Sequence, residues 1–170
     1  MLDPNFLRTV VLVCEHDNEI GTLGYVLNQP CNLFLSDVME DLPGADFPLF
    51  IGGPVGHDAV HYIHRLGDQI PESKDLGNEV YWGGNFETIH AMLAQNQLSH
   101  NDIKFFLGYS GWEVGQMAEE MKTRSWMICS SFNPALPFLY KEEDLWKEAL
   151  IAMGPKYAHV ANFPIDPRLN

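Results

Sequence analysis

The chain has few cysteines and no apolar run long enough to cross a membrane. It holds three cysteines in 170 residues, Cys14, Cys31 and Cys129, and these form no CxxC pair and no disulfide framework. The best apolar run, residues 10–14, has the length of one buried strand, whereas a transmembrane helix needs about 20 apolar residues. The first residues show no export signal. We therefore expect a cytoplasmic protein whose thiols are reduced.

Basic residues are scarce as well. Ten lysines and arginines stand against 23 aspartates and glutamates, which gives a formal net charge of −13 at pH 7. A surface this acidic repels the phosphates of nucleic acids and the headgroups of anionic lipids. The sequence therefore disfavours direct binding to nucleic acid or to a membrane.

Strand-like segments come in a run and then alternate with helical segments. Residues 8–14 and 21–28 predict a hairpin, because two β-prone runs flank a polar turn. Further strands are expected at 48–51, 59–66, 79–82, 104–107 and 125–129, and helices at 36–40, after Asn85, after Ser110 and from 142 to Gly154. This order predicts a single α+β domain over residues 1–170, with a mixed and strongly curved sheet.

Ser110 is the first candidate for chemistry. It lies between an expected strand and an expected helix, in the run Gly108-Tyr109-Ser110-Gly111-Trp112, which is the context of a serine nucleophile elbow. Trp112 occupies the position where that motif requires a second small residue. The alternative is that the Ser110 hydroxyl caps the following helix, which accounts for the residue fully.

Three histidines form a second candidate. His57, His61 and His64 would share one face of a helix and could bind zinc with Asp58 nearby. The residues between them favour a strand, on which His61 and His64 point to opposite faces. The alternative is therefore a half-buried strand with histidines at its rim.

Cys14 is a candidate redox residue, because His16 follows it closely and an imidazole can lower the pKa of a thiol. Against this, adjacent strand residues face opposite ways, and the Glu15 carboxylate raises the thiol pKa. The alternative is a buried cysteine that packs as a small apolar side chain.

Glycine-rich turns and nearby polar residues form a candidate binding surface for a ligand or partner. Core packing does not explain residues of these types, and an aromatic side chain beside a turn is a plausible interface anchor. The surface consists of Asn28, Pro30, Gly52, Gly53, Pro54, Val55, Gly108, Tyr109, Gly111, Trp112, Gly115 and Gln116.

Several short motifs follow one another along nearly the whole chain. They are residues 3–6 with 8–11, Glu15-His16, residues 24–28 with Pro30, residues 52–55, Gly108-Tyr109, Gly111-Trp112, Gly115-Gln116 and Trp126. Together they resemble the AlgH/YqgE family of uncharacterised bacterial proteins, also called UPF0301. The resemblance implies a bifurcated sheet wrapped into a pseudo-barrel with helices packed on it, in a cytosolic protein.

The resemblance also has consequences for function. Some family members are described as transcriptional regulators, and the family has no established reaction. Members usually begin with an apolar strand before the motif at residues 3–6, so we expect this chain to lack that edge strand. Position 110 is often alanine in the family, which weakens the case for a Ser110 nucleophile.

We therefore expect a non-catalytic protein, monomeric or homodimeric, that acts through a protein partner or a small ligand and needs no cofactor or metal. The alternatives are a hydrolase or metal-dependent enzyme that uses Ser110 or the His57, His61 and His64 cluster, and a thiol sensor that uses Cys14.

Overall fold

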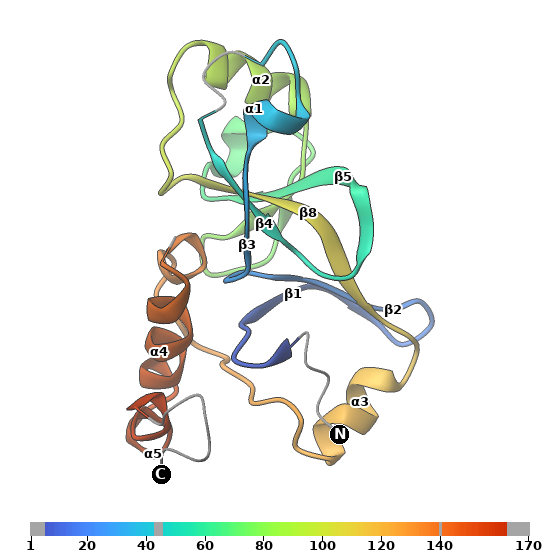
Figure 1. Ribbon diagram of the computed structural model, residues 1–170. Helices are drawn as coiled ribbons and strands as arrows, with labels where there is room; N and C mark the ends of the chain where they lie inside the picture. Colours follow the sequence, from blue (N-terminus) through green and yellow to red (C-terminus); the bar gives the residue numbers. More distant parts are fainter. Residues whose placement is uncertain (1–5, 43–45, 140, 163–170) are drawn as a thin grey trace.

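The structure, a computed structural model, describes residues 6–42, 46–139 and 141–162 and contains one curled sheet (Figure 1). In the first half of the chain the elements are β1 (Val11–Asp17), β2 (Gly21–Val26), β3 (Pro30–Phe34), α1 (Leu35–Val38), β4 (Pro48–Ile51) and β5 (Val55–His64). In the second half they are β6 (Lys74–Asp75), β7 (Tyr81–Trp82), α2 (Phe86–Ala94), β8 (Ile103–Trp112), α3 (Gln116–Lys122), α4 (Glu142–Ala152) and α5 (Pro155–Ala158). Single 3₁₀ turns occupy Gly67–Gln69, Leu136–Phe138 and Val160–Asn162.

The sheet divides at β8. One edge of β8 pairs antiparallel with β5. On the other edge, residues 105–107 pair parallel with β4, and residues 110–112 pair antiparallel with β2. Because two diverging strands share this edge, the sheet splits and curls into a half-barrel. The mixed, strongly curved and bifurcated sheet predicted from the sequence is confirmed, as is the β1–β2 hairpin.

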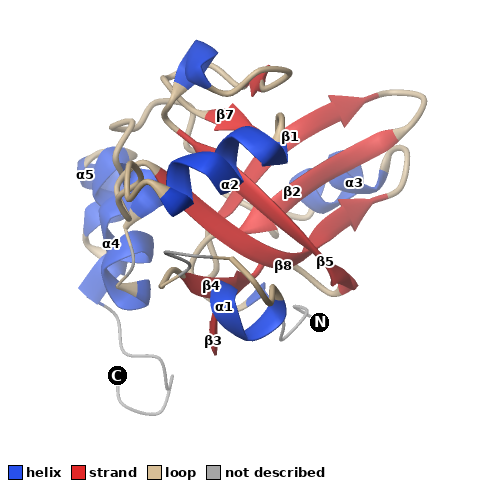
Figure 2. Cartoon of the chain, turned by 90° about the horizontal axis from the view of Figure 1, so that it is seen from above, coloured by secondary structure: helices blue, strands red, loops and turns tan. Residues whose placement is uncertain are grey.

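Two apolar clusters lie on opposite faces of the central strands. Neighbouring residues on a strand point to opposite faces, so Phe105 belongs to one cluster and Phe106 to the other. The first cluster includes buried residues of α1 and α2, and the second includes Phe138, which precedes α4, and Leu145 of α4. Figure 2 shows α2 lying across the strands, with α4 and α5 beyond one end of the sheet and α3 near the hairpin.

The helix after Asn85 begins as predicted. The Asn85 side chain accepts a hydrogen bond from the backbone N–H of Thr88 at 2.9 Å, and Ile89 and Leu93 are buried at helical spacing. The helix predicted from residue 142 is also present as α4 and ends before Gly154.

Two sequence predictions are wrong. Ser110 does not cap a helix, because β8 continues to Trp112 and α3 begins only at Gln116. Residues 125–129 form no strand, and no backbone hydrogen bond joins residues 126–132 to another described residue. Their β-prone side chains are not sufficient, because a strand needs a pairing partner as well as propensity.

Candidate functional site: an apolar cleft beside β1

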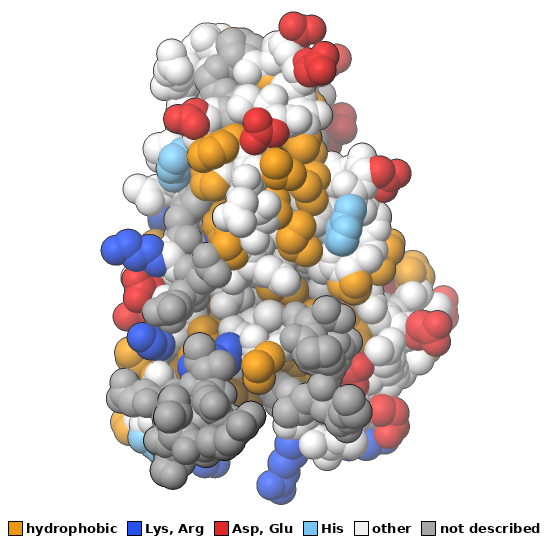
Figure 3. Space-filling view, in the orientation of Figure 1, with side chains coloured by type: hydrophobic (Ala, Val, Ile, Leu, Met, Phe, Trp, Pro, Cys, Tyr) orange, Lys and Arg blue, Asp and Glu red, His pale blue; other side chains and the backbone are white. Residues whose placement is uncertain are grey.

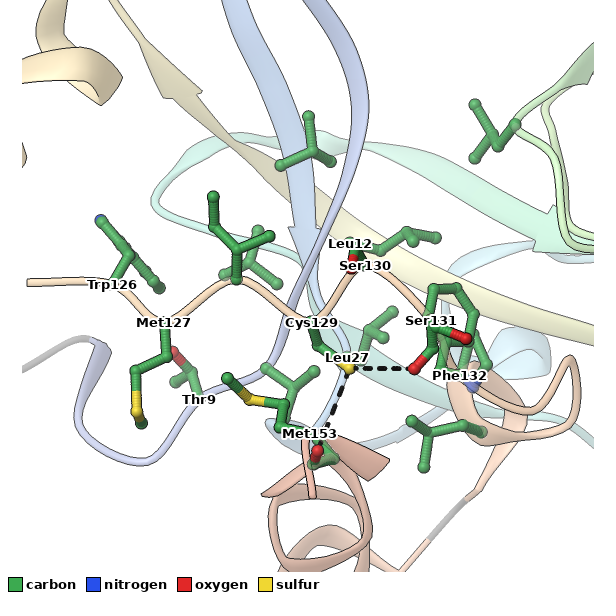
Figure 4. A pocket seen from close by; sticks show the side chains of 18 of the residues that line it. Thr9, Leu12, Leu27, Trp126, Met127, Cys129, Ser130, Ser131, Phe132 and Met153 are labelled. Atoms are coloured by element: carbon green, nitrogen blue, oxygen red, sulfur yellow. Dashed lines mark hydrogen bonds between the residues drawn. The ribbon is translucent and has the colours of Figure 1, made fainter. Parts of the chain in front are cut away.

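A cleft of about 740 Å³ lies between β1 and the segment that connects α3 to α4. Residues 126–132 of that segment pass along one side of it, and Trp146, Ala149, Leu150 and Met153 line it from α4 and its C-terminal end (Figure 4). Its size falls within the range of about 300–1,000 Å³ that is typical of ligand sites.

Methionine and tryptophan dominate the lining. Four methionines line the cleft from α3, the connecting segment and the end of α4, and three tryptophans accompany them: Met117, Met121, Met127, Met153, Trp112, Trp126 and Trp146. Methionine side chains are flexible and polarisable, so they adapt to apolar partners of different shapes. None of the described lining residues is an aspartate, glutamate, lysine or arginine. The cleft therefore suits an uncharged, apolar occupant.

Glu120, on α3, holds two tryptophans of the cleft wall together through hydrogen bonds. Its Oε2 atom accepts the indole N–H of Trp112 at 3.1 Å and that of Trp126 at 2.6 Å. The Trp112 and Trp126 rings meet edge to face, with centroids 5.8 Å apart. Two indoles held by one carboxylate give this wall a fixed geometry although the connecting segment has no strand partner.

The glycines of the candidate surface belong to a close crossing of two chain segments. A Cβ atom on Gly52 would overlap the carbonyl oxygen of Gly108, and one on Gly53 would overlap the backbone nitrogen and the hydroxyl of Ser110. The Ser110 side chain is buried, and its hydroxyl donates to the carbonyl oxygen of Gly52 at 3.0 Å. These glycines thus have a structural role, which is to let the β4–β5 turn approach β8.

Other residues of that predicted surface are separated in space or engaged locally. Asn28 accepts a hydrogen bond from the backbone N–H of Val10 at 2.8 Å and donates one to the carbonyl oxygen of Arg8 at 2.9 Å, which ties the start of β1 to the end of β2. Pro30 pairs with Phe50 across β3 and β4. Asn28 and Pro30 are therefore explained by local structure.

The remaining members of the predicted surface lie near the end of β8 or in the turn after β4. Gly115 is the N-cap of α3 in a left-handed conformation, and Gln116 accepts from the backbone N–H of Glu113 at 2.9 Å. Gly111 is exposed, as are Pro54 and Val55, and Tyr109 is half-buried. Of the twelve predicted residues only Trp112 lines the cleft.

The three histidines lie on β5 but do not converge. His57 Nε2 lies 2.6 Å from the carbonyl oxygen of Gly53, whereas the buried His64 lies 2.9 Å from the Ser73 hydroxyl. His61 packs against Tyr25, with ring centroids 5.5 Å apart, and burial lowers the pKa of both His61 and His64. In the part of the chain that the structure describes, no three histidine, cysteine, aspartate or glutamate side chains come close enough to hold a metal.

Cys14 lies in a bulge of β1 and is 4% exposed. Burial is the main cause that raises the pKa of its thiol to about 12, and the nearby Lys74 opposes this only in part. The geometry favours the interpretation of Cys14 as a small apolar side chain over its interpretation as a reactive thiol.

A buried lysine joins β8 to the chain before α4. Lys104 Nζ donates to the carbonyl oxygen of Leu139 at 2.7 Å and to that of Pro137 at 3.3 Å, and lies 4.0 Å from the centroid of the Phe50 ring. Burial lowers the pKa of this amine to about 7. Lys104 thus fixes the position from which α4 extends along the cleft.

Sequence reasoning missed most of the cleft. It expected a helix after Ser110 and a strand at residues 125–129, and it placed only Trp112 of the residues that line the cleft in the candidate surface. The signal that could have found the site is the concentration of methionine and tryptophan between residues 112 and 128, where Met127 and Ile128 are 50% and 68% exposed. None of the described helices is both long and apolar enough to cross a bilayer.

The curled, divided sheet with its packed helices defines the class of α+β protein, and an apolar cleft lies beside β1, with no aspartate, glutamate, lysine or arginine among its described lining residues. A family model described as AlgH-like matches residues 1–158, and the chain belongs to that family. The family predicted from the sequence motifs is confirmed.

Relatives and solved structures agree with this. The chain is 37% identical to a UPF0301 protein of Chlorobium luteolum, over all of this chain and 89% of the relative, and 38% identical to one of Bacteroides fragilis, over 99% and 85%. The solution structure of the AlgH protein from Pseudomonas aeruginosa superimposes with a TM-score of 0.75 at 28% identity, covering 96% of this chain and 88% of that one. A crystal structure from Corynebacterium diphtheriae, at 19% identity and a TM-score of 0.74, shares the fold over 96% of this chain and 86% of that one.

Proposed function

We propose that this protein is a non-catalytic binding protein of the cytoplasm whose cleft takes up an apolar segment of a partner polypeptide. The observation that carries the proposal is the lining of the cleft, which combines four methionines and three tryptophans with no charged residue among those described. Apolar, methionine-rich surfaces of this kind are typical of proteins that bind polypeptide segments.

The positions of the candidate catalytic groups support a role in binding over a role in catalysis. Ser110 is buried and donates to a backbone carbonyl oxygen, the Cys14 thiol has a raised pKa, and the three histidines lie apart. A nucleophile needs a base within hydrogen-bond reach and access for a substrate. Binding of a polypeptide segment in the cleft, by contrast, requires no catalytic group.

The charge of the chain bears on how it would affect gene expression. With a net charge of −13, direct binding to DNA is opposed by repulsion from the phosphates. Any regulatory effect would therefore be exerted through the protein partner. A DNA mobility shift with the purified protein that persists at high salt would contradict this part of the proposal.

The first experiment tests whether the cleft is occupied by a polypeptide in the cell. Met127 is half-exposed and lines the cleft, so p-benzoylphenylalanine at position 127 should crosslink a partner on illumination. The matched control is the same residue at position 38, because Val38 is 41% exposed and lies in a different pocket, together with Val60 and Phe86. Figure 3, in the orientation of Figure 1, shows hydrophobic side chains gathered over the middle of the molecule.

The expected result is a crosslinked polypeptide from position 127 and none from position 38. The adduct should disappear when Ile128, which also lines the cleft and is 68% exposed, is changed to glutamate. Equal crosslinking from both positions, or no crosslink from position 127, would overturn the proposed function.

A further inference from the structure

A second pocket, of about 500 Å³, lies at the edge of β5 and shares no described lining residue with the cleft. One edge of β5 pairs with β8, and on the other edge β7 pairs only with Ile63 and His64 among the described residues. The pocket lies beside the rest of that edge, between the end of α1 and the start of α2, elements in the upper half of Figure 1. Its volume falls within the range of about 300–1,000 Å³ that is typical of small-molecule sites.

Aromatic rings form much of the lining. Trp82 and Phe86 are half-buried, and Tyr62 lies beneath them in the core. The Tyr62 hydroxyl donates to the carbonyl oxygen of Gly84 at 2.6 Å, and the indole N–H of Trp82 donates to the hydroxyl of Tyr25 at 3.0 Å. Because these polar atoms already have partners, the rings offer an occupant mainly their carbon atoms and π electrons. The Tyr62 and Phe86 rings are tilted by 49°, which leaves no parallel slot between them for a flat aromatic ligand.

Two polar side chains of the lining have no hydrogen-bond partner among the described residues. Asp58 is exposed, and its carboxylate forms no hydrogen bond or ion pair within the described chain. His61 is half-buried and contacts the rings of Tyr25 and Tyr109, but its nitrogen atoms bond to no described residue. Burial lowers the pKa of His61, so the imidazole is neutral at pH 7 and can accept a hydrogen bond from a ligand. Asp58 therefore supplies the one charge among the described lining residues.

This lining restricts the chemistry of the occupant. An anion would be repelled by Asp58, and a neutral apolar molecule would take water from the carboxylate without replacing its hydrogen bonds. A metal ion needs three or more ligating side chains, whereas only Asp58 and His61 among the described lining residues carry carboxylate or imidazole groups. An organic cation satisfies both parts of the lining, because aromatic rings and a carboxylate each attract it. The net charge of −13 also attracts cations to the protein.

We propose that this pocket binds a small organic cation of the methylated-ammonium class, whose charge pairs with Asp58 and whose methyl groups pack against Trp82 and Phe86. The Trp82 ring already attracts one ammonium group, since Lys74 Nζ lies 5.4 Å from its centroid. That lysine pairs with Glu15 at 2.8 Å and does not line the pocket. The site is separate from the cleft and acts independently of the proposed partner.

The first test is titration of the isotope-labelled full chain with choline, followed by nuclear magnetic resonance. The matched ligand is the uncharged carbon isostere of choline, in which a tert-butyl group replaces the trimethylammonium group. We expect choline at millimolar concentration to shift the amide signals of His61, Gly83 and Gly84, and the isostere to bind at least tenfold more weakly. Equal binding of the two ligands, or no shift with choline, would overturn the proposal.

Two variants test the carboxylate and the ring. Asp58→Asn and Phe86→Leu should each weaken choline binding at least fivefold, since the first removes the charge and the second removes the π electrons but keeps an apolar side chain. The matched controls are Asp68→Asn and Phe34→Leu, which change an exposed carboxylate and an exposed ring outside the pocket. Equal weakening by Asp58→Asn and Asp68→Asn would show that net charge alone attracts choline, and would overturn the site. The cleft variant Ile128→Glu should leave choline binding unchanged.

A last arm concerns the source of the cation. The pocket is assigned to a free small molecule, so a short peptide that contains trimethyl-lysine should bind no more tightly than choline. Binding of that peptide at least tenfold more tightly than choline, with loss in Asp58→Asn, would assign the pocket to a side chain of another protein and overturn the assignment to a free cation.

Discussion

The Ser110 hydroxyl donates a hydrogen bond to the carbonyl oxygen of Gly52 at 3.0 Å, and so joins β8 to the turn that follows β4. The same carbonyl oxygen also accepts the backbone N–H of Val26 at 2.8 Å. Three strands of the divided sheet therefore meet at one oxygen atom. This point lies where β8 passes from pairing with β4 to pairing with β2.

Replacing Ser110 by alanine should lower the free energy of unfolding by about 1 kcal/mol, because the Gly52 oxygen keeps its second donor. Urea denaturation followed by circular dichroism measures this. Crosslinking from position 127 should be unchanged, since Ser110 does not line the cleft. Loss of partner binding with unchanged stability would return Ser110 to the list of functional residues.

Replacing Gly53 by alanine should be much more damaging than replacing Gly111. The added methyl group at position 53 would overlap Ser110, whereas at position 111 its nearest neighbour is a Tyr109 ring carbon at 3.5 Å. We expect a loss of about 1–3 kcal/mol or more for Gly53→Ala and little change for Gly111→Ala, measured by thermal unfolding. Similar effects for the two variants would contradict the structural role of this crossing.

Lys104 should make stability depend on pH. Its pKa is lowered to about 7 in the folded protein, whereas in the unfolded chain it stays near 10.5. Between pH 7 and 9 the unfolded state therefore binds more protons. Stability relative to Lys104→Met should rise with pH by up to about 1.4 kcal/mol per pH unit.

This dependence is measured as the difference in unfolding free energy between the wild type and Lys104→Met from pH 7 to 9. The raised pKa of Cys14 lowers stability at alkaline pH in both proteins, so its contribution cancels in this difference. Lys122→Met, which removes a lysine whose side chain is 69% exposed, is the control. If the unfolding free energies of the wild type and Lys104→Met change with pH in parallel, the amine of Lys104 stays charged in the folded protein.

Cys14 should resist alkylation in the native protein. Burial raises its pKa to about 12, so almost no thiolate exists at pH 8. Iodoacetamide labelling followed by peptide mass analysis should leave Cys14 unmodified in buffer and modify it in urea. Labelling of native Cys14 at the rate of a small-molecule thiol would revive the thiol-sensor hypothesis.

Replacing Glu120 by glutamine should loosen one wall of the cleft. Both indole N–H groups donate to one carboxylate oxygen, and Gln116 donates to the other, so an amide cannot accept all three bonds. We expect the free energy of unfolding to fall by about 1–3 kcal/mol and the tryptophan fluorescence spectrum to shift.

The matched control for that variant is Glu119→Gln. Glu119 forms an exposed ion pair with Lys122 on the same helix, and such a pair contributes only about 0–1 kcal/mol. Equal effects of the two changes on fluorescence would show that Glu120 does not organise the wall.

Patterns local in the sequence predicted much of the fold. The β-branched run before Cys14, the polar turn after it and the Asn85 cap depend on neighbouring residues alone, and the structure confirms the hairpin and α2. The family motifs also predicted the divided sheet. Residues 125–129 show the limit, because their side chains favour a strand but strand formation depends on a partner elsewhere in space.

The candidate site could be predicted from the sequence only in small part. Glycines and Ser110 looked functional because no local pattern explained them, and the explanation lies in a contact between residues 52–53 and 108–110, more than 50 residues apart. The cleft has the same origin, since its walls come from β1, from residues 112–132 and from α4.

The sequence by itself determined the acidic charge, the low number of cysteines, the order of most strands and helices, and the family. Those properties follow from composition, periodicity and short motifs. Only the tertiary structure decided that Cys14 is buried, that Ser110 is a structural hydrogen-bond donor and that methionines and tryptophans surround a cleft. The burial of a side chain and the grouping of side chains around a cleft depend on which distant segments pack together. No local sequence pattern contains that information.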